Sequence, residues 1–217
     1  MKNTQRALGN FVVVGVVLYF VLILILHLLR PDSNPARHFL SEYAVGPFAV
    51  LGTIVFYVMA LTAAALTLGL LFAVNRSTWL YVSSFFLILV SVAFVTSAIF
   101  PTDVNPKGGP PIAHTQSGAI HDLAGLFVFL GLVIASLTLP WALKRDATWR
   151  ASFNRALLLG LLILGLFFAF FALPWAWKGL GQRAMVFVVL IWLLTNGLQL
   201  RRHRIASRDS NHIDNGP

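Results

Sequence analysis

The chain has 217 residues, of which 58% are hydrophobic and only 11% are charged. Soluble domains carry about 25% charged residues, and lipid accepts apolar surface that a single soluble core could not enclose, so the composition predicts a multi-pass membrane protein. Cysteine is absent, which excludes disulfides, thiolate metal sites and thiol nucleophiles. The net charge of +9 does not indicate nucleic-acid binding, because most Lys and Arg lie at the ends of apolar runs, where they set orientation and meet anionic lipid head groups.

Six apolar runs alternate with polar loops over residues 1–200. Each run is near the roughly 20 residues that a helix needs to cross about 30 Å of hydrocarbon. The alternating pattern of barrel strands is missing, and only helices and closed barrels satisfy their backbone in lipid. The sequence therefore predicts an all-α fold: a polytopic membrane bundle of six transmembrane helices in one domain, followed by a polar, disordered cytoplasmic tail over 201–217. The predicted spans are 8–29, 47–74, 79–100, 120–143, 154–175 and 181–200.

The distribution of Lys and Arg predicts the orientation of this bundle. Eleven of them lie in the N-terminus, the 75–78 loop, the 144–155 loop and the tail, against five in the other three loops. We therefore expect a protein of the plasma (inner) membrane with both termini cytoplasmic. The three remaining loops, with the helix ends beside them, then face outward, and they hold most of the acids and histidines: Asp32, Glu42, Asp103, Asp122, His27, His38, His114 and His121.

The first outer loop contains a helical pattern. Asn34 is a good N-cap and Pro35 suits the first helical position, and His38 and Glu42 are four residues apart and thus neighbours on a helix. The loop predicts a short interfacial amphipathic helix after the first span. Its polar face either meets water, with Glu42 paired with His38 or Arg37, or lines a pocket over the bundle; surface amphipathic helices are common, so the loop alone favours water.

The second outer loop carries Asp103, His114, His121 and Asp122. One interpretation is structural, because a carboxylate such as Asp122 in the first turn of a helix is favoured by the helix dipole. The other joins the four side chains into a metal or acid–base cluster. The spacing does not support a metal, since His114 and His121 are seven residues apart and no His-Glu-x-x-His occurs. A divalent metal held by His38, His114 and His121 stays an alternative, and no cofactor is identifiable.

The third outer loop combines Trp175 and Trp177 with Lys178, Gln182 and Arg183. It is either an interfacial belt with cations that reach toward water, or a place where a cation holds an anionic head group. Arg183 stands at the start of an apolar span and needs a partner. A carboxylate from one of the other two loops is the partner that we expect.

Three short motifs resemble those of an uncharacterised family of bacterial and archaeal six-helix membrane proteins, catalogued only as a domain of unknown function. They are Ser41-Glu42-Tyr43 after the first span, Phe100-Pro101-x-Asp103 after the third, and His121-Asp122 at the start of the fourth. The resemblance covers residues 10–200. It implies a six-helix architecture and a polar cluster on the outer face, and it implies no activity.

Three functions are compatible with these residues. The first is a bundle of unknown activity whose outer cluster binds a lipid head group or small ligand through Ser41, Lys178, Gln182 and Arg183. The alternative is a membrane-embedded lipid hydrolase or transferase, with or without a metal, in which Asp103, His121 and either Glu42 or Asp122 are acid–base groups. A small transporter comes third, because no charged residue lies near the middle of any span. Neither enzymatic activity nor oligomeric state follows from the sequence.

Overall fold

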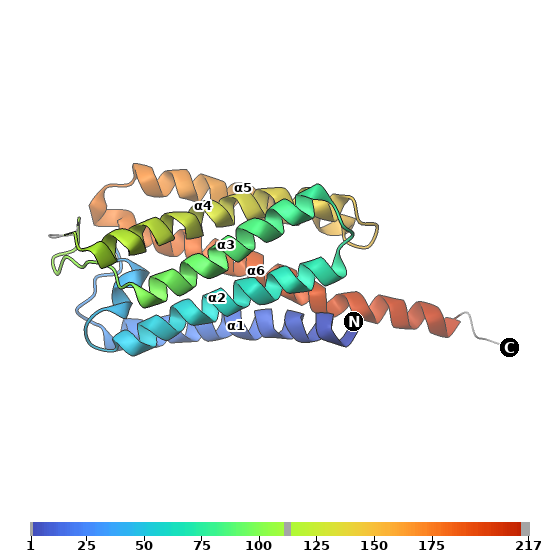
Figure 1. Ribbon diagram of the computed structural model, residues 1–217, viewed down its shortest axis with the longest axis horizontal. Coiled ribbons are helices and arrows are strands. Elements are labelled where there is room, and N and C mark those ends of the chain that lie inside the picture. The colour runs from blue at the N-terminus through green and yellow to red at the C-terminus, as the bar shows by residue number, and fades with distance from the viewer. Residues whose placement is uncertain (1, 111–113, 214–217) are drawn as a thin grey trace.

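Six long helices and two short 3-10 helices make up the computed structural model of the protein (Figure 1). The structure describes the backbone of residues 2–110 and 114–213 and the side chains of 3–110 and 114–202. All six long helices are long and apolar enough to cross a membrane, which confirms the predicted all-α polytopic bundle. In chain order the elements are α1 (Lys2–Leu29), η1 (Leu40–Ala44), α2 (Ala49–Ala73), α3 (Thr78–Ile99), α4 (Gln116–Lys144), η2 (Arg150–Ser152), α5 (Phe153–Ala172) and α6 (Trp175–Ile213).

Two helix boundaries differ from the predicted spans in ways that matter for the site. Helix α4 begins at Gln116 and not at 120, because Thr115 caps it: its hydroxyl accepts a hydrogen bond of 3.0 Å from the Gly118 N–H. Helix α6 begins at Trp175, directly after Pro174, so the predicted third loop is mostly the first turns of a helix. At its other end α6 continues past residue 200 to Ile213; the predicted disorder of 201–217 stays a prediction, and 214–217 lie outside the described residues.

The helices form a closed ring. Each packs against the next one in the chain, from α1 to α6, and α6 returns to pack against α1. Figure 1 shows the six helices running lengthwise, with the α1–α2, α3–α4 and α5–α6 connections at one end. We call this end the predicted outer end, and the end that carries the α2–α3 and α4–α5 connections the predicted inner end. The orientation itself rests on the distribution of Lys and Arg.

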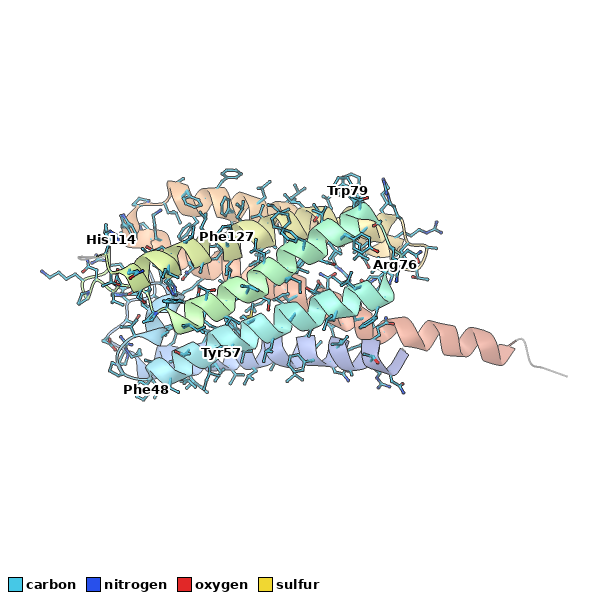
Figure 2. The ribbon with its side chains drawn as sticks, in the orientation of Figure 1. Phe48, Tyr57, Arg76, Trp79, His114 and Phe127 are labelled. Atoms are coloured by element: carbon cyan, nitrogen blue, oxygen red, sulfur yellow. The ribbon has the colours of Figure 1, made fainter. Side chains whose placement is uncertain are left out.

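Small residues set the closest helix contacts, as expected where lipid supplies no hydrophobic drive between helices. Gly131 and Ala135, four residues apart on α4, both face α3. A Cβ at Gly131 would lie 2.7 Å from Val90, and the Ala135 carbonyl accepts a hydrogen bond of 3.1 Å from the Ser83 hydroxyl. Large apolar side chains such as Tyr57 and Phe127 point away from the ring (Figure 2), which is the surface that faces lipid.

The predicted inner end is fastened by Asp146, a residue that the sequence did not single out. Its buried carboxylate accepts hydrogen bonds of 2.9 Å from the backbone N–H groups of Asn75 and Thr148, and so joins the α2–α3 and α4–α5 connections. Burial alone would raise the pKa of this carboxyl, but the hydrogen bonds from Thr148 and Asn75 more than offset burial and lower it. Trp79 and Trp141 lie together at the same end, with ring centroids 6.4 Å apart, and tryptophan is enriched at such helix ends where a membrane meets water.

The α4–α5 contact yields a prediction about packing. A Cβ at Gly160 would lie 2.6 Å from the Ser136 carbonyl oxygen, whereas one at Gly165 on the same helix would meet nothing within 4 Å. We expect Gly160→Ala to destabilise the protein by about 1–3 kcal/mol, because backbone cannot yield as a side chain does. Gly165→Ala should be neutral or slightly stabilising. Melting temperatures of the two purified variants in detergent test this, and equal values would contradict it.

Candidate functional site

A cavity of about 490 Å³ lies inside the helix ring toward the predicted outer end. All six long helices contribute to its wall. Apolar and aromatic side chains line most of it, among them Ile23, Val55, Met59, Leu132 and Val189. Its polar lining comes largely from the outer loops and the adjacent helix ends: Ser41, Glu42, Thr102, Asp103, His121, Asp122, Lys178 and Gln182.

The first outer loop forms the roof of this cavity, and it is not the continuous amphipathic helix that the sequence predicts. Asn34 starts a single turn, in which its side chain accepts from the Ala36 N–H at 2.9 Å. The chain then breaks at Phe39, whose N–H donates to Glu42 Oε1 at 2.8 Å, and continues as the 3-10 helix η1. After this break Ser41 and Glu42 line the cavity. The loop therefore does not place its polar and apolar side chains on opposite faces of one α-helix.

The predicted contact between His38 and Glu42 is confirmed. The Nδ1 of His38 lies 2.7 Å from Oε2 of Glu42, and the two side chains are only 9% and 12% exposed. These two side chains therefore meet little bulk water, and since Ser41 and Glu42 line the cavity, the pocket-lining interpretation fits this part of the loop better. His38 contacts Glu42 but is not itself part of the cavity wall.

Arg183 fastens the first loop to α6, and it does so without a carboxylate. Its guanidinium donates to the carbonyl oxygens of Pro35 (2.9 Å), His38 (2.7 Å) and Gly179 (3.1 Å), and to Nε2 of His27 (3.1 Å). The expected Glu42–Arg183 pair is therefore wrong for the part of the chain that the structure describes, where Glu42 pairs with His38. Arg183 also lies outside the cavity wall.

Lys178 and Gln182 line the cavity, but their polar atoms are partly used by the fold. The Lys178 Nζ donates to the Phe170 carbonyl at 3.2 Å, in the last turn of α5, and lies 4.9 Å from the Phe170 ring centroid and 5.4 Å from that of Trp175. A cation at a helix C-terminus over aromatic rings is doubly favoured. The Gln182 Oε1 accepts from the Leu40 N–H at 2.6 Å, which leaves its amide nitrogen toward the cavity.

Asp103 closes the second outer loop onto the start of α4. Its two carboxylate oxygens accept from the backbone N–H and the hydroxyl of Thr115, each at 2.8 Å. These bonds, the backbone one first, lower the pKa of the Asp103 carboxyl below its usual range. Asp103 also lines the cavity, so it combines a structural role with a place at the mouth. His114, one residue before Thr115, is exposed and outside the cavity wall.

His121 and Asp122 lie in the second turn of α4, because the helix starts at Gln116. The first-turn explanation for Asp122 is therefore wrong. The Nδ1 of His121 lies 2.8 Å from the Phe100 carbonyl oxygen, which can only accept, so Nδ1 carries the proton and Nε2 offers a lone pair. The ring is 5% exposed, lines the cavity and meets the Phe56 ring at 5.7 Å. No described residue hydrogen-bonds to its Nε2 or to the exposed Asp122 carboxylate.

The cavity thus collects most of the residues predicted for a site. It brings together Ser41, Glu42, Asp103, His121, Asp122, Lys178 and Gln182, and leaves out His38, His114 and Arg183. Among the side chains of residues 3–110 and 114–202, no three His, Asp or Glu come together in an arrangement that could hold a metal ion. Ser97 and Gly125 also line the cavity, from within apolar spans, and they were not among the predicted site residues. A small or hydroxyl-bearing residue in a span is too common to mark a site.

The fold and the cavity define a multi-pass membrane protein with a polar-mouthed chamber inside a ring of six helices. The chain belongs to the family described as protein of unknown function (DUF998), which matches residues 13–199. This match confirms the resemblance that the loop motifs indicated. Neither the curated proteins nor the solved structures contain a match to it.

The bonds of Asp103 predict a pH-dependent contribution to stability. Because its pKa is lowered in the folded protein, the ionised carboxylate stabilises the loop above the usual aspartate range, about pH 4, and this stabilisation disappears as the pH falls through the lowered pKa. We expect Asp103→Asn to melt below wild type at pH 7, with a difference that shrinks toward pH 3. Asp122→Asn, which removes no described hydrogen bond, should melt like wild type at pH 7. A constant difference for Asp103→Asn across this range would contradict the prediction.

Proposed function

We propose that the protein binds a membrane amphiphile, with the polar head at the cavity mouth and the hydrocarbon part inside the helix ring. The observation that supports this proposal is that polar and apolar side chains line different parts of one cavity. Charged and hydrogen-bonding side chains gather toward the outer loops, and aliphatic and aromatic side chains line most of the remainder. The volume of about 490 Å³ lies within the roughly 300–1,000 Å³ typical of small-molecule sites.

The side wall between α4 and α5 supports entry from the bilayer. These helices approach closely at Gly160 and Ser136, toward the predicted inner end, while an added Cβ at Gly125, which lines the cavity, would meet nothing within 4 Å. Two cavity-lining residues on this side, Leu126 and Phe171, are 44% and 55% exposed. A hydrocarbon chain already dissolved in lipid would meet an apolar opening here without crossing water.

The distribution of Lys and Arg supports an outward-facing mouth, because the three loops around it carry fewer of them than the other end. The amphiphile would then come from the outer leaflet. This orientation is part of the proposal, as is the plasma membrane as its location.

A second candidate is lipid hydrolysis or group transfer, favoured by one observation. His121 lines the cavity with Glu42, Asp103 and Asp122, and its Nδ1 is held by the Phe100 carbonyl while its Nε2 has no described partner; an imidazole held in this way is suited to acid–base work. Turnover of a bilayer lipid by the wild-type protein, lost in His121→Gln while amphiphile binding persists, would establish catalysis. Binding without turnover would leave the ligand-binding function.

Filling the cavity tests the binding proposal. Gly125 lines the cavity and has open space beside it, so Gly125→Leu should occupy the chamber without straining α4. We expect the wild-type protein, released from membranes and examined by native mass spectrometry, to carry an amphiphile at one copy per chain, and Gly125→Leu to carry little of it. Gly165→Leu adds the same side chain outside the cavity and should keep the bound molecule. Equal occupancy in both folded variants would refute cavity binding.

A further inference from the structure

We infer that the head group of the bound amphiphile is a protonated primary or secondary amine, and not a phosphate or another anion. The inference rests on the proposed function and adds the chemical class of the ligand. It reverses the expectation drawn from the sequence, in which Lys178 and Arg183 hold an anionic head group.

The cations of the outer loops are either held by the protein itself or lie outside the cavity wall. Arg183 lies outside the cavity wall and donates to three backbone carbonyls and to His27. Lys178 does line the cavity, but its Nζ is held by the last turn of α5 and by the rings around it. Arg30 pairs with Asp32 at 2.9 Å, and neither Arg37 nor Lys107 is part of the wall. No arginine therefore presents a free fork to an anion.

The groups that remain free are mainly hydrogen-bond acceptors. Three carboxylates line the cavity, and only that of Glu42 has a described ion-pair partner, His38. Asp103 accepts from the neutral Thr115 and keeps its charge, and Asp122 has no described hydrogen-bond partner at all. His121, a residue that is only 5% exposed, also lines the cavity, and its Nε2 has no described hydrogen-bond partner. In the neutral ring with the proton on Nδ1, this nitrogen is an acceptor that a donor in the cavity would satisfy.

Deeper groups in the cavity are compatible with the same ligand. The hydroxyls of Ser97 and Tyr19 line the cavity, belong to buried residues and have no described hydrogen-bond partner. Hydroxyls can accept as well as donate. The Gln182 amide nitrogen, like the Lys178 ammonium, can only donate, and a hydroxyl or carbonyl beside the amine of the ligand would satisfy it.

A protonated amine matches this set of groups. It donates two or three hydrogen bonds, enough for the Asp122 carboxylate and the His121 Nε2, and its charge is attracted to the carboxylates and to aromatic rings of the wall such as Phe56. A phosphate would bring negative charge beside three carboxylates. A quaternary ammonium would satisfy the charge, but it has no hydrogen to donate, so His121 would stay without a partner.

Three amphiphiles with the same 12-carbon chain separate these possibilities: dodecylamine, dodecyltrimethylammonium and dodecyl phosphate. Their affinities for the full-length protein are measured at pH 7 in a neutral detergent by calorimetry. We expect dodecylamine to bind tightest, at least about tenfold tighter than dodecyl phosphate, as one charge-assisted hydrogen bond implies. It should also bind more tightly than dodecyltrimethylammonium. Octylamine should bind more weakly than dodecylamine because fewer CH₂ groups are buried.

A matched pair of charge-neutral variants locates the contact. Asp122→Asn removes a carboxylate that lines the cavity, and we expect it to weaken dodecylamine binding about fivefold, the size of a solvent-accessible ion pair. Asp32→Asn removes an outer carboxylate that does not line the cavity, and should leave the affinity unchanged. Melting temperatures confirm that both variants are folded.

The outcomes distinguish the inference from the function on which it rests. Tightest binding of dodecyl phosphate, or equal affinities of the primary and quaternary amines, would overturn the amine head group while cavity binding stands. Equal effects of Asp122→Asn and Asp32→Asn would overturn the assigned contact. If none of the three amphiphiles binds with a dependence on chain length, and Gly125→Leu changes nothing, the proposed function itself fails.

Discussion

The hold of Arg183 on the first outer loop is the interaction on which the site depends. One guanidinium satisfies the carbonyls of Pro35, His38 and Gly179 and reaches His27, so it joins α1, the loop and α6. Carbonyl groups near the membrane surface need such donors, because an unsatisfied buried carbonyl is costly. With the loop held in place, η1 covers the ring and presents Ser41 and Glu42 to the chamber. The same contacts explain why the charge of Arg183 is not available to a ligand.

The chamber itself follows from how a ring of six helices closes. Toward the predicted inner end, small residues allow close approach; a Cβ at Gly160 would meet Ser136, and one at Gly69 would lie 2.6 Å from Leu200 of α6. Toward the predicted outer end, side chains leave a cavity of about 490 Å³ inside the ring. A cavity of this size inside a close-packed protein is unusual unless it has a use. Its mixture of apolar wall and unpartnered polar groups is the physical basis for proposing an amphiphile as occupant.

Whether a charged group at the mouth can bind a ligand depends on the contacts that it already makes. Counted by residue type, the outer loops offer both acids and bases, which is why the sequence allowed an anionic ligand. In the structure these groups differ in whether other parts of the protein already bind them. Lys178 caps the end of α5, while the carboxylate of Asp122 and the Nε2 of His121 have no described partner. A ligand binds the groups that are still free, whatever the composition of the loops. Here the free groups are mainly acceptors, which is why we infer an amine.

The number and approximate position of the spans, the all-α class and the membership of a six-helix family could be read from the sequence. These depend on local properties: runs of apolar residues long enough to cross hydrocarbon, and short motifs at their ends. The His38–Glu42 contact was also predictable, because residues four apart meet on any helical turn. The break at Phe39, by contrast, was not predicted, since a capping carboxylate from Glu42 competes there with continued α-helix.

The sequence by itself therefore determined a membrane-spanning architecture, because the cost of exposing backbone and charge to lipid acts on each segment separately. Only the tertiary structure decided which of the outer residues share a chamber and which of them are free. Asp103 is bonded to Thr115, Arg183 to loop carbonyls and His121 to the Phe100 carbonyl, and each of these contacts joins segments that are apart in the chain. Such contacts depend on how helices pack around a centre, and the order of residues along a single helix does not contain that information.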